Sequence, residues 1–265
     1  RDEKRLPEAE IAFLRKTARK TWSFFADLVG PEDHDLPPDN IQMNPDETIA
    51  HRTSPTNLGL ALLANLAAWD FGTIPTGKLL ERTGKTFASM TRLERFKGHF
   101  YNWYDTGTLQ PLPPLYVSSV DSGNLAGHLH VLRMGLLELP GRAIVSERIF
   151  AALCDVIGIL EDLPENGLAP GRLAALRKMA AFPDAEAPFT LVEVRNRLHA
   201  LRNLSGRKSS GEHLPTATEY WLQEFFEQLA DVENELKWMA SWLDFPAAKV
   251  DPGAFPFFEK IPSLI

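Results

Sequence analysis

The residue types that could do chemistry gather between Gly98 and His128. The first 19 residues of this stretch, GHFYNWYDTGTLQPLPPLY, hold one phenylalanine, one tryptophan and three tyrosines beside Asp105, and Asp121 follows shortly after. Sugars present flat C–H faces ringed with hydroxyl groups, so aromatic rings stack on the faces while carboxylates and amides bind the hydroxyls. One interpretation of the stretch is therefore the lining of a sugar-binding cleft.

The candidate binding residues combine aromatic, amide and charged side chains. If the stretch is extended, Tyr101, Trp103 and Asp105 share one face, and Asn102 and Tyr104 share the other. Arg52 and Asp121 lie where two helices are expected to begin, and backbone N–H groups are presented there. The predicted binding set is Arg52, Asn102, Trp103, Tyr104, Asp121 and Asn124.

A second interpretation assigns the same residues to structure alone. Trp103 and Tyr104 would then cover the end of a helical bundle, Asp121 would be only an N-cap, and Arg52 would be a surface cation. The residues by themselves leave both interpretations open. Asp105 and Asp121 are the carboxylates of the stretch, so they are the two weak candidates for catalysis, and the catalytic residues are otherwise unknown.

Composition excludes several other functions. The net charge of -7 and a pI near 5.6 argue against nucleic-acid binding, which needs a basic face. No nucleotide-binding glycine motif, CxxC or HExxH is present, so we expect no cofactor and no metal. The acidic loop around His34 could suggest a metal site, but the ligand spacing is missing and solvation of the loop is favoured. Cys154 is the single cysteine and lies in an apolar run, where a buried thiol is expected.

The apolar spacing predicts an all-α fold. Apolar residues recur at steps of three and four, and proline or glycine interrupts the pattern between helices. One short β-hairpin is expected near residue 105, with Asp105-Thr106-Gly107 as its turn and Gly107 free to take a positive φ. We predict about eight helices, over residues 7–29, 55–71, 76–94, 117–139, 146–163, 171–181, 190–204 and 222–243.

The last predicted helix carries the most regular apolar stripe. Leu222, Leu229 and Leu236 belong to it, and they could pair two chains as a coiled coil. Trp221, Phe226, Trp238 and Trp242 widen the apolar face, which favours burial inside a bundle over a two-stranded seam. Self-association through the three leucines is kept as the alternative.

No segment is long and apolar enough to predict a membrane span. The longest apolar run, Leu58 to Phe71, is shorter than the roughly 20 residues that a span needs, and Asn65 and Asp70 interrupt it. The first ten residues are highly charged and do not resemble a signal peptide. The segment itself is therefore expected to be soluble.

Two long blocks of the chain resemble a known family. The blocks are HRTSPTNLGLALLANLAAWDFGTI and RFKGHFYNWYDTGTLQPLPPLYVSSVDSGNLAGHL. They are similar to the central domain of cyclic β-1,2-glucan synthases, which are very large bacterial inner-membrane enzymes. That domain is of the glucoamylase-like type, whose fold is an (α/α)6 toroid. The resemblance covers about residues 50–129.

The resemblance implies a reaction and a context. The family's central domain cuts linear β-1,2-glucan and rejoins its ends as a ring, a retaining transglycosylation that needs two carboxyl groups about 5–5.5 Å apart. It implies that residues 1–140 are the N-terminal part of this domain and that residues 141–265 are a helical extension or insertion, which ends in a long amphipathic helix. It further implies β-1,2-glucan and other synthase domains as partners, and a place on the cytoplasmic face of the inner membrane.

Two functions follow from the sequence. In the first, the chain contributes glucan-binding subsites to the cyclisation reaction, and the isolated piece is inactive because the expected catalytic glutamates have no match in it. In the second, the chain is a non-catalytic interaction or scaffold domain of the same synthase, built on the helices after residue 146.

Overall fold

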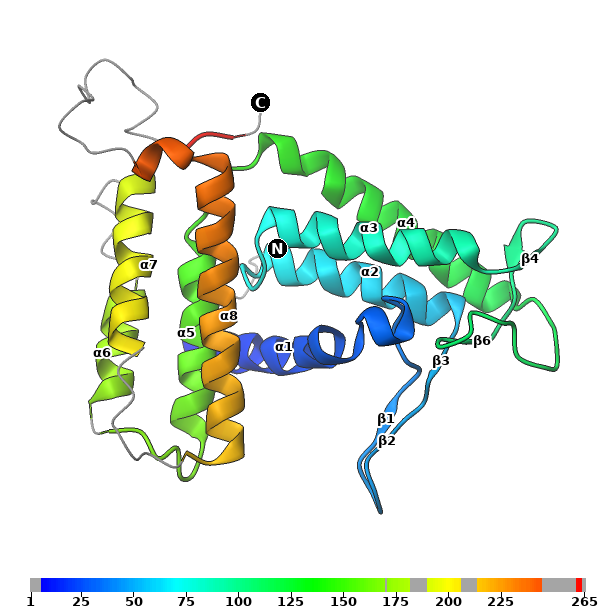
Figure 1. Ribbon diagram of the computed structural model, residues 1–265, viewed down its shortest axis with the longest axis horizontal. Coiled ribbons are helices and arrows are strands. Elements are labelled where there is room, and N and C mark those ends of the chain that lie inside the picture. Colours follow the sequence, from blue (N-terminus) through cyan, green and yellow to red (C-terminus); the bar gives the residue numbers. More distant parts are fainter. Residues whose placement is uncertain (1–5, 170, 182–189, 206–213, 245–260, 264–265) are drawn as a thin grey trace. The chain divides into compact units, whose positions relative to one another are not determined.

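The computed structural model describes residues 6–169, 171–181, 190–205, 214–244 and 261–263 (Figure 1). Within these residues the chain forms eight α-helices and three antiparallel pairs of two-residue strands, which confirms the predicted all-α class. The (α/α)6 toroid stays a prediction. The helices are α1 (Glu8–Leu28), α2 (Pro55–Asp70), α3 (Thr76–Arg92), α4 (Ser119–Glu138), α5 (Arg148–Asp162), α6 (Arg172–Ala180), α7 (Leu191–Ser205) and α8 (Thr216–Met239).

The chain divides into two compact units. Unit 1 takes the described residues within 1–19, 69–76 and 140–265, and unit 2 takes residues 20–68 and 77–139. Unit 2 ends one residue before the predicted boundary at 140, but residues 1–19 and 69–76 group with the C-terminal helices. The assignment of residues 1–140 to the cyclisation domain and of residues 141–265 to a helical extension or insertion stays a prediction.

Unit 1 is a four-helix bundle. Helix α5 contacts α6 and α8, and α7 contacts the same two helices, so the four close around one apolar core (Figure 1). Leu153, Ile157, Leu198 and Phe225 are among the side chains with no exposed surface. This core explains why α5, although apolar on most sides, is stable as an internal helix.

The apolar stripe of α8 faces this core. Leu222, Leu229 and Leu236 are 6%, 0% and 4% exposed, so bundle burial within one chain is favoured over a coiled coil. Trp221 is buried as expected. The expectation for Trp238 was wrong: it is 80% exposed, because it lies off the stripe near the end of α8.

The first half of α1 is held in unit 1 by ion pairs. Arg15 Nη2 lies 2.8 Å from Asp155, and Arg19 Nη2 lies 2.9 Å from Glu224. Burial lowers the pKa of Arg19, against the opposing effect of Glu224. Because these arginines are one helical turn apart, they share a face of α1 and reach α5 and α8 respectively.

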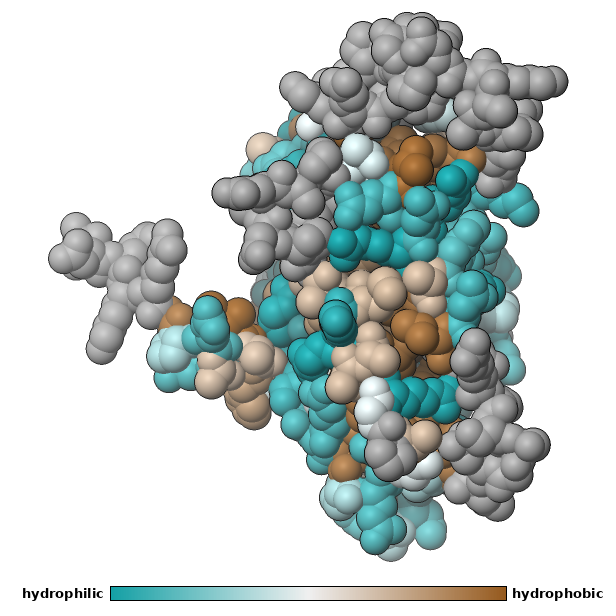
Figure 2. Space-filling model, turned by 90° about the vertical axis from the view of Figure 1, so that its left-hand side faces the viewer, coloured by the Kyte–Doolittle hydropathy of each residue, from teal (hydrophilic) through white to brown (hydrophobic). Residues whose placement is uncertain are grey.

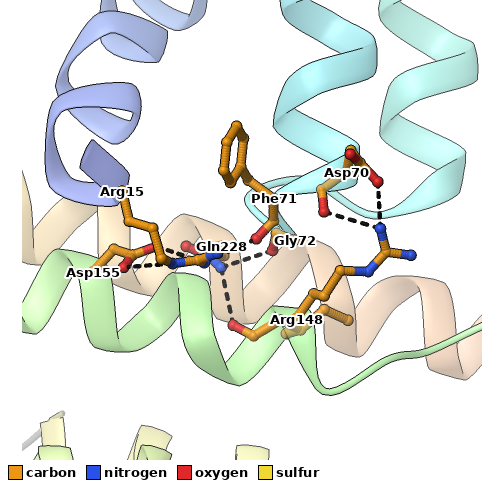
Figure 3. Close-up of polar contacts among 8 residues, drawn as sticks. Arg15, Asp70, Phe71, Gly72, Arg148, Asp155 and Gln228 are labelled. Carbon is orange, nitrogen blue, oxygen red and sulfur yellow. Dashed lines mark hydrogen bonds and ion pairs between the residues drawn. The ribbon is translucent and has the colours of Figure 1, made fainter. Parts of the chain in front are cut away.

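The turn between α2 and α3 is capped by side chains of unit 1 (Figure 3). The carbonyls of Asp70, Phe71 and Gly72 accept hydrogen bonds in turn from Arg148 (3.0 Å), Arg15 (3.3 Å) and Gln228 (3.1 Å). The last carbonyls of a helix have no partner within the helix, so these three donors satisfy them. At the start of α3, the Thr76 N–H donates to Glu235 at 3.0 Å.

Unit 2 packs α2, α3 and α4 around a second core. Leu58 and Leu62 of α2, Met90 of α3 and Leu132 of α4 are buried in it together with Tyr104. Ser54 caps α2 by accepting from Asn57 N–H at 3.2 Å, and Pro55 is its first residue, as the sequence predicted. Helix α2 therefore begins directly after the segment that carries Arg52.

The strands of unit 2 differ from the predicted single hairpin. Strand β6 (Tyr104–Asp105) pairs with the distant β3 (Arg52–Thr53). The residues that follow fold back on β6 through the Tyr104–Pro111 bridge and the hydrogen bond from Asp105 N–H to the Gln110 carbonyl at 3.0 Å. Leu109, rather than Gly107, takes the positive φ, at 61°. Two further hairpins are β1 (Ile41–Gln42) with β2 (Thr48–Ile49), inside the predicted loop, and β4 (Arg95–Phe96) with β5 (His99–Phe100).

The surface is mixed in character. On the face shown in Figure 2, hydrophilic residues surround smaller apolar patches. Among the described residues, no helix combines the length and apolar character needed to cross a bilayer.

We predict that Gly72→Ala destabilises unit 1 by about 3 kcal/mol or more, because two costs add. Gly72 has φ +83°, which an L side chain rarely adopts, and its Cβ would overlap the backbone of Arg148. Urea unfolding followed by circular dichroism measures the loss.

Gly171→Ala is the matched control. Gly171 has φ +80° but open space around the Cβ position, so only the left-handed penalty of about 1–2 kcal/mol is expected. Equal losses for the two variants would contradict the proposed overlap.

Candidate functional site

The candidate site is built on the β3–β6 ribbon. Arg52 lies opposite Asp105, and Thr53 lies opposite Tyr104. Thr53 and Tyr104 have no exposed surface, whereas the Arg52 side chain is 50% exposed. The ribbon therefore has a core face and an outer face, and the outer face carries Arg52, Trp103 and Asp105.

Tyr104 belongs to the core face. Its hydroxyl donates to the Glu94 carbonyl at 2.6 Å and accepts from the Tyr101 N–H at 2.7 Å. Burial raises the pKa of Tyr104 to about 12. The residue has no surface on which a sugar could stack, which corrects its assignment to the predicted binding set.

Arg52 and Trp103 form a stacked pair on the outer face. The guanidinium carbon of Arg52 lies 4.7 Å from the centre of the Trp103 ring. Asp39 Oδ2 accepts from Arg52 Nε at 3.2 Å and Nη2 at 2.9 Å, and Asp39 Oδ1 accepts from Asn57 at 3.2 Å. These contacts fix the guanidinium over the ring, a geometry that a cation and an indole favour.

Asn102 joins Trp103 to helix α4. In the amide orientation that pairs donors with acceptors, its nitrogen donates to Asp121 Oδ2 at 2.9 Å. Its oxygen then accepts from Trp103 Nε1 at 2.8 Å and from the Tyr116 hydroxyl at 2.7 Å. Asn102 is only 6% exposed, so its role here is to position its three neighbours.

The first turn of α4 contributes Asp121 and Asn124. Ser118 is the N-cap and accepts from the Asp121 N–H at 3.1 Å, so the assignment of Asp121 as the N-cap is wrong. The carboxylate Oδ1 of Asp121 instead accepts from Thr56 Oγ1 at 2.6 Å. Asn124 donates to the same Thr56 oxygen at 3.1 Å, and its own side chain is exposed.

Both candidate catalytic carboxylates favour the ionised form. Hydrogen bonds from Thr108 are the largest cause that lowers the pKa of Asp105. Burial acts to raise the pKa of Asp121, but hydrogen bonds from Ser118 and Thr56 outweigh it, and the net pKa is lowered. A general acid needs a raised pKa near the working pH, so these two side chains suit the binding of hydroxyl groups better than proton donation.

The structure thus brings five of the six predicted binding residues together, all except Tyr104. The sequence reasoning missed Asp39, Thr56 and Asn57, which hold them in place, and also the pair formed by Asp33 and His51. Asp33 and Asp39 lie in the acidic loop that was interpreted as solvated. Their partners come from distant segments, so no local spacing could have identified them.

No group of three or more His, Cys, Asp or Glu side chains is arranged to hold a metal within the part of the chain that the structure describes. Burial raises the pKa of the Cys154 thiol, which leaves it a poor nucleophile.

Comparison with known proteins gives one clear relationship. The chain is 48% identical over 122 residues to the cyclic beta-(1,2)-glucan synthase NdvB of Rhizobium meliloti (strain 1021). The match covers 46% of this chain and 4% of that protein, so the chain spans a small fraction of its relative's length. No family model matches the chain.

We predict that Asp121→Asn lowers the stability of unit 2 by about 1–2 kcal/mol at neutral pH, the usual worth of hydrogen bonds to a charged group. Both oxygens of Asp121 accept hydrogen bonds, one from Thr56 and one from Asn102, so the amide nitrogen of an asparagine would face one of these two donors. Because the folded pKa of Asp121 is lowered, its contribution is complete above the unfolded value near 3.9 and is lost as the pH falls through the folded pKa.

Urea midpoints between pH 2 and pH 7 measure this effect. The wild type and Asp121→Asn should differ at pH 6 and converge at the acid end. Asp46→Asn, at an exposed position in the β1–β2 turn, is the control and should stay near the wild type. A difference that is constant with pH would contradict the ionised carboxylate.

Proposed function

We propose that this chain is a segment of a cyclic β-1,2-glucan synthase and that unit 2 contributes a glucan-binding subsite. The 48% identity over 122 residues to the Rhizobium enzyme carries the proposal. The subsite consists of Arg52, Trp103, Asp121 and Asn124, with Asn102, Asp39 and Thr56 as supporting residues. The family resemblance implies a larger membrane protein, with this segment on the cytoplasmic face.

The chemistry of the outer face supports a sugar ligand. Two of the five N–H groups of Arg52 donate to Asp39, and within the described residues the other three have no hydrogen-bond partner. Asn124 is exposed, and of its side-chain polar atoms only the nitrogen has a hydrogen-bond partner within the described residues. Donors and acceptors that point outward beside an indole match the hydroxyls and apolar face of glucose.

The rim of this subsite is apolar. Leu115, Tyr116 and Val120 are 54%, 46% and 70% exposed, and the Tyr116 hydroxyl is tied to Asn102. Exposed apolar side chains around a polar centre are typical of a binding groove. We infer that successive glucose units lie across these side chains.

The exposed faces of the helices support a larger domain. Helix α4 is apolar on nearly all sides, yet Val131, Met134 and Leu137 are 52%, 47% and 61% exposed. A helix of this kind is normally covered all round. We infer that further helices of the same polypeptide cover this face and bring the catalytic carboxylates of the retaining reaction.

We predict that the chain binds linear β-1,2-glucan and that Trp103→Ala weakens binding about tenfold, because a stacked ring is lost. Isothermal titration calorimetry and indole fluorescence measure the affinity, with a linear β-1,3-glucan as the linkage control. Trp238→Ala is the matched control, since Trp238 is exposed on unit 1, and it should bind like the wild type. A folded wild type that neither releases heat nor changes fluorescence with the glucan would contradict the subsite.

A second prediction separates binding from chemistry. Asp121→Asn, introduced into the full-length polypeptide that the proposal implies, should weaken glucan binding several-fold while cyclisation remains measurable. The products are followed by chromatography of the cyclic glucans. Complete loss of cyclisation with unchanged binding would instead assign Asp121 to the reaction.

A further inference from the structure

A second polar cluster lies at the end of the β3–β6 ribbon, around the fully buried Thr106. The Thr106 N–H donates to the His51 carbonyl at 3.1 Å, and its carbonyl lies 2.8 Å from His34 Nδ1. Its hydroxyl donates to Asp33 Oδ1. Every polar group of this threonine is therefore satisfied by residues of the loop around residue 33 or by His51.

Within the cluster, a buried carboxylate faces an exposed imidazole. His51 Nδ1 lies 2.9 Å from Asp33 Oδ1 and 3.1 Å from Asp33 Oδ2. The Asp33 residue is 8% exposed, whereas the His51 side chain is 58% exposed. A carboxylate oxygen accepts a hydrogen bond from a ring N–H, so this contact favours the tautomer with the proton on Nδ1, in which Nε2 is left as an acceptor.

The backbone that presents Asp33 is strained. His34 and Asp35 have φ values of 54° and 56°, in the left-handed region that residues other than glycine rarely occupy. The two residues turn the chain directly after Asp33, and Asp35 N–H closes the turn on the Gly30 carbonyl at 2.7 Å. Strain of this kind persists where surrounding contacts hold it and is concentrated at functional sites.

We propose that His51 contacts the ligand, with Nε2 accepting a hydrogen bond from a glucose hydroxyl, and that Asp33 is its positioning residue. The identity of the ligand rests on the proposed function. His51 directly precedes Arg52, and successive Cα atoms are about 3.8 Å apart, so the two can serve adjacent parts of one ligand. The Arg52 N–H donates to the Ala50 carbonyl at 2.7 Å, so the chain turns at His51, and a glucan that touches both side chains crosses the end of the ribbon.

The first test needs no glucan. Nitrogen-15 NMR of histidine-labelled protein should show the Nδ1–H tautomer for His51, and Asp33→Asn should abolish this preference. Diethylpyrocarbonate should acylate His51 several-fold faster than His130, an exposed histidine for which no side-chain contact is found in the described residues. Equal rates at the two histidines, or a tautomer unaffected by Asp33→Asn, would overturn the positioning role.

The second test uses linear β-1,2-glucan. Bound glucan should protect His51 but not His130 from acylation, and His51→Ala should weaken binding about fivefold without changing the urea midpoint. Asp33 is buried, so Asp33→Asn could weaken binding by disturbing the fold. His51 is exposed, so His51→Ala tests the ligand contact without that effect. Glucan that binds by calorimetry but leaves His51 unprotected overturns the contact while the proposed function stands.

The failure of the proposed function gives a different result. Wild-type protein that is folded and binds no glucan overturns both the subsite and the glucan contact of His51. The tautomer and the acylation rates then still decide whether Asp33 positions a proton-accepting imidazole.

Discussion

The pairing of Arg52–Thr53 with Tyr104–Asp105 is the constraint on which the candidate site depends. A two-residue antiparallel pair contributes little stability by itself. Its position is fixed because Thr53 and Tyr104 are fully buried and because the Tyr104 hydroxyl bonds to two backbone groups. With the core face fixed, Arg52 and Trp103 have to lie together on the outer face, and α2 begins two residues after the pair.

The carboxylates of unit 2 act mainly as hydrogen-bond hubs between distant segments. Asp39 connects a loop to β3 and α2, and Asp121 connects α4 to Thr56 and Asn102. A carboxylate that accepts hydrogen bonds from two segments holds their side chains in place before a ligand binds. The conformational entropy that these side chains lose on binding is then smaller. The same logic applies in unit 1, where charged and amide side chains cap the α2–α3 turn at Asp70, Phe71 and Gly72.

The helices were predictable from the sequence, whereas the contacts of the candidate site were not. The apolar period identified every described helix, but the alternation of residues 101–105 did not hold, because Tyr101 packs against Tyr104 and Asn102 bonds to the Trp103 ring. Both faces of the segment 101–105 carry aromatic rings, so its sequence did not show which face is buried. Tyr104 was misassigned for this reason. The partner of β6 was missed because strand pairing depends on packing between distant segments. Trp238 was misplaced because composition cannot show which side of α8 the bundle covers.

The charge balance of the outer face favours a neutral polyhydroxyl ligand over an anion. The positive charge of Arg52 is already paired with Asp39, so the attraction left for an anionic ligand is small. The Arg52–Asp39 pair leaves hydrogen-bonding groups unused on the Arg52 guanidinium, and Asn124 has a further one. The guanidinium lies beside the Trp103 indole. A sugar uses such groups without the cost of removing a charge from water. The ion pair therefore fixes Arg52 over the Trp103 ring and supports a neutral ligand for the proposed subsite.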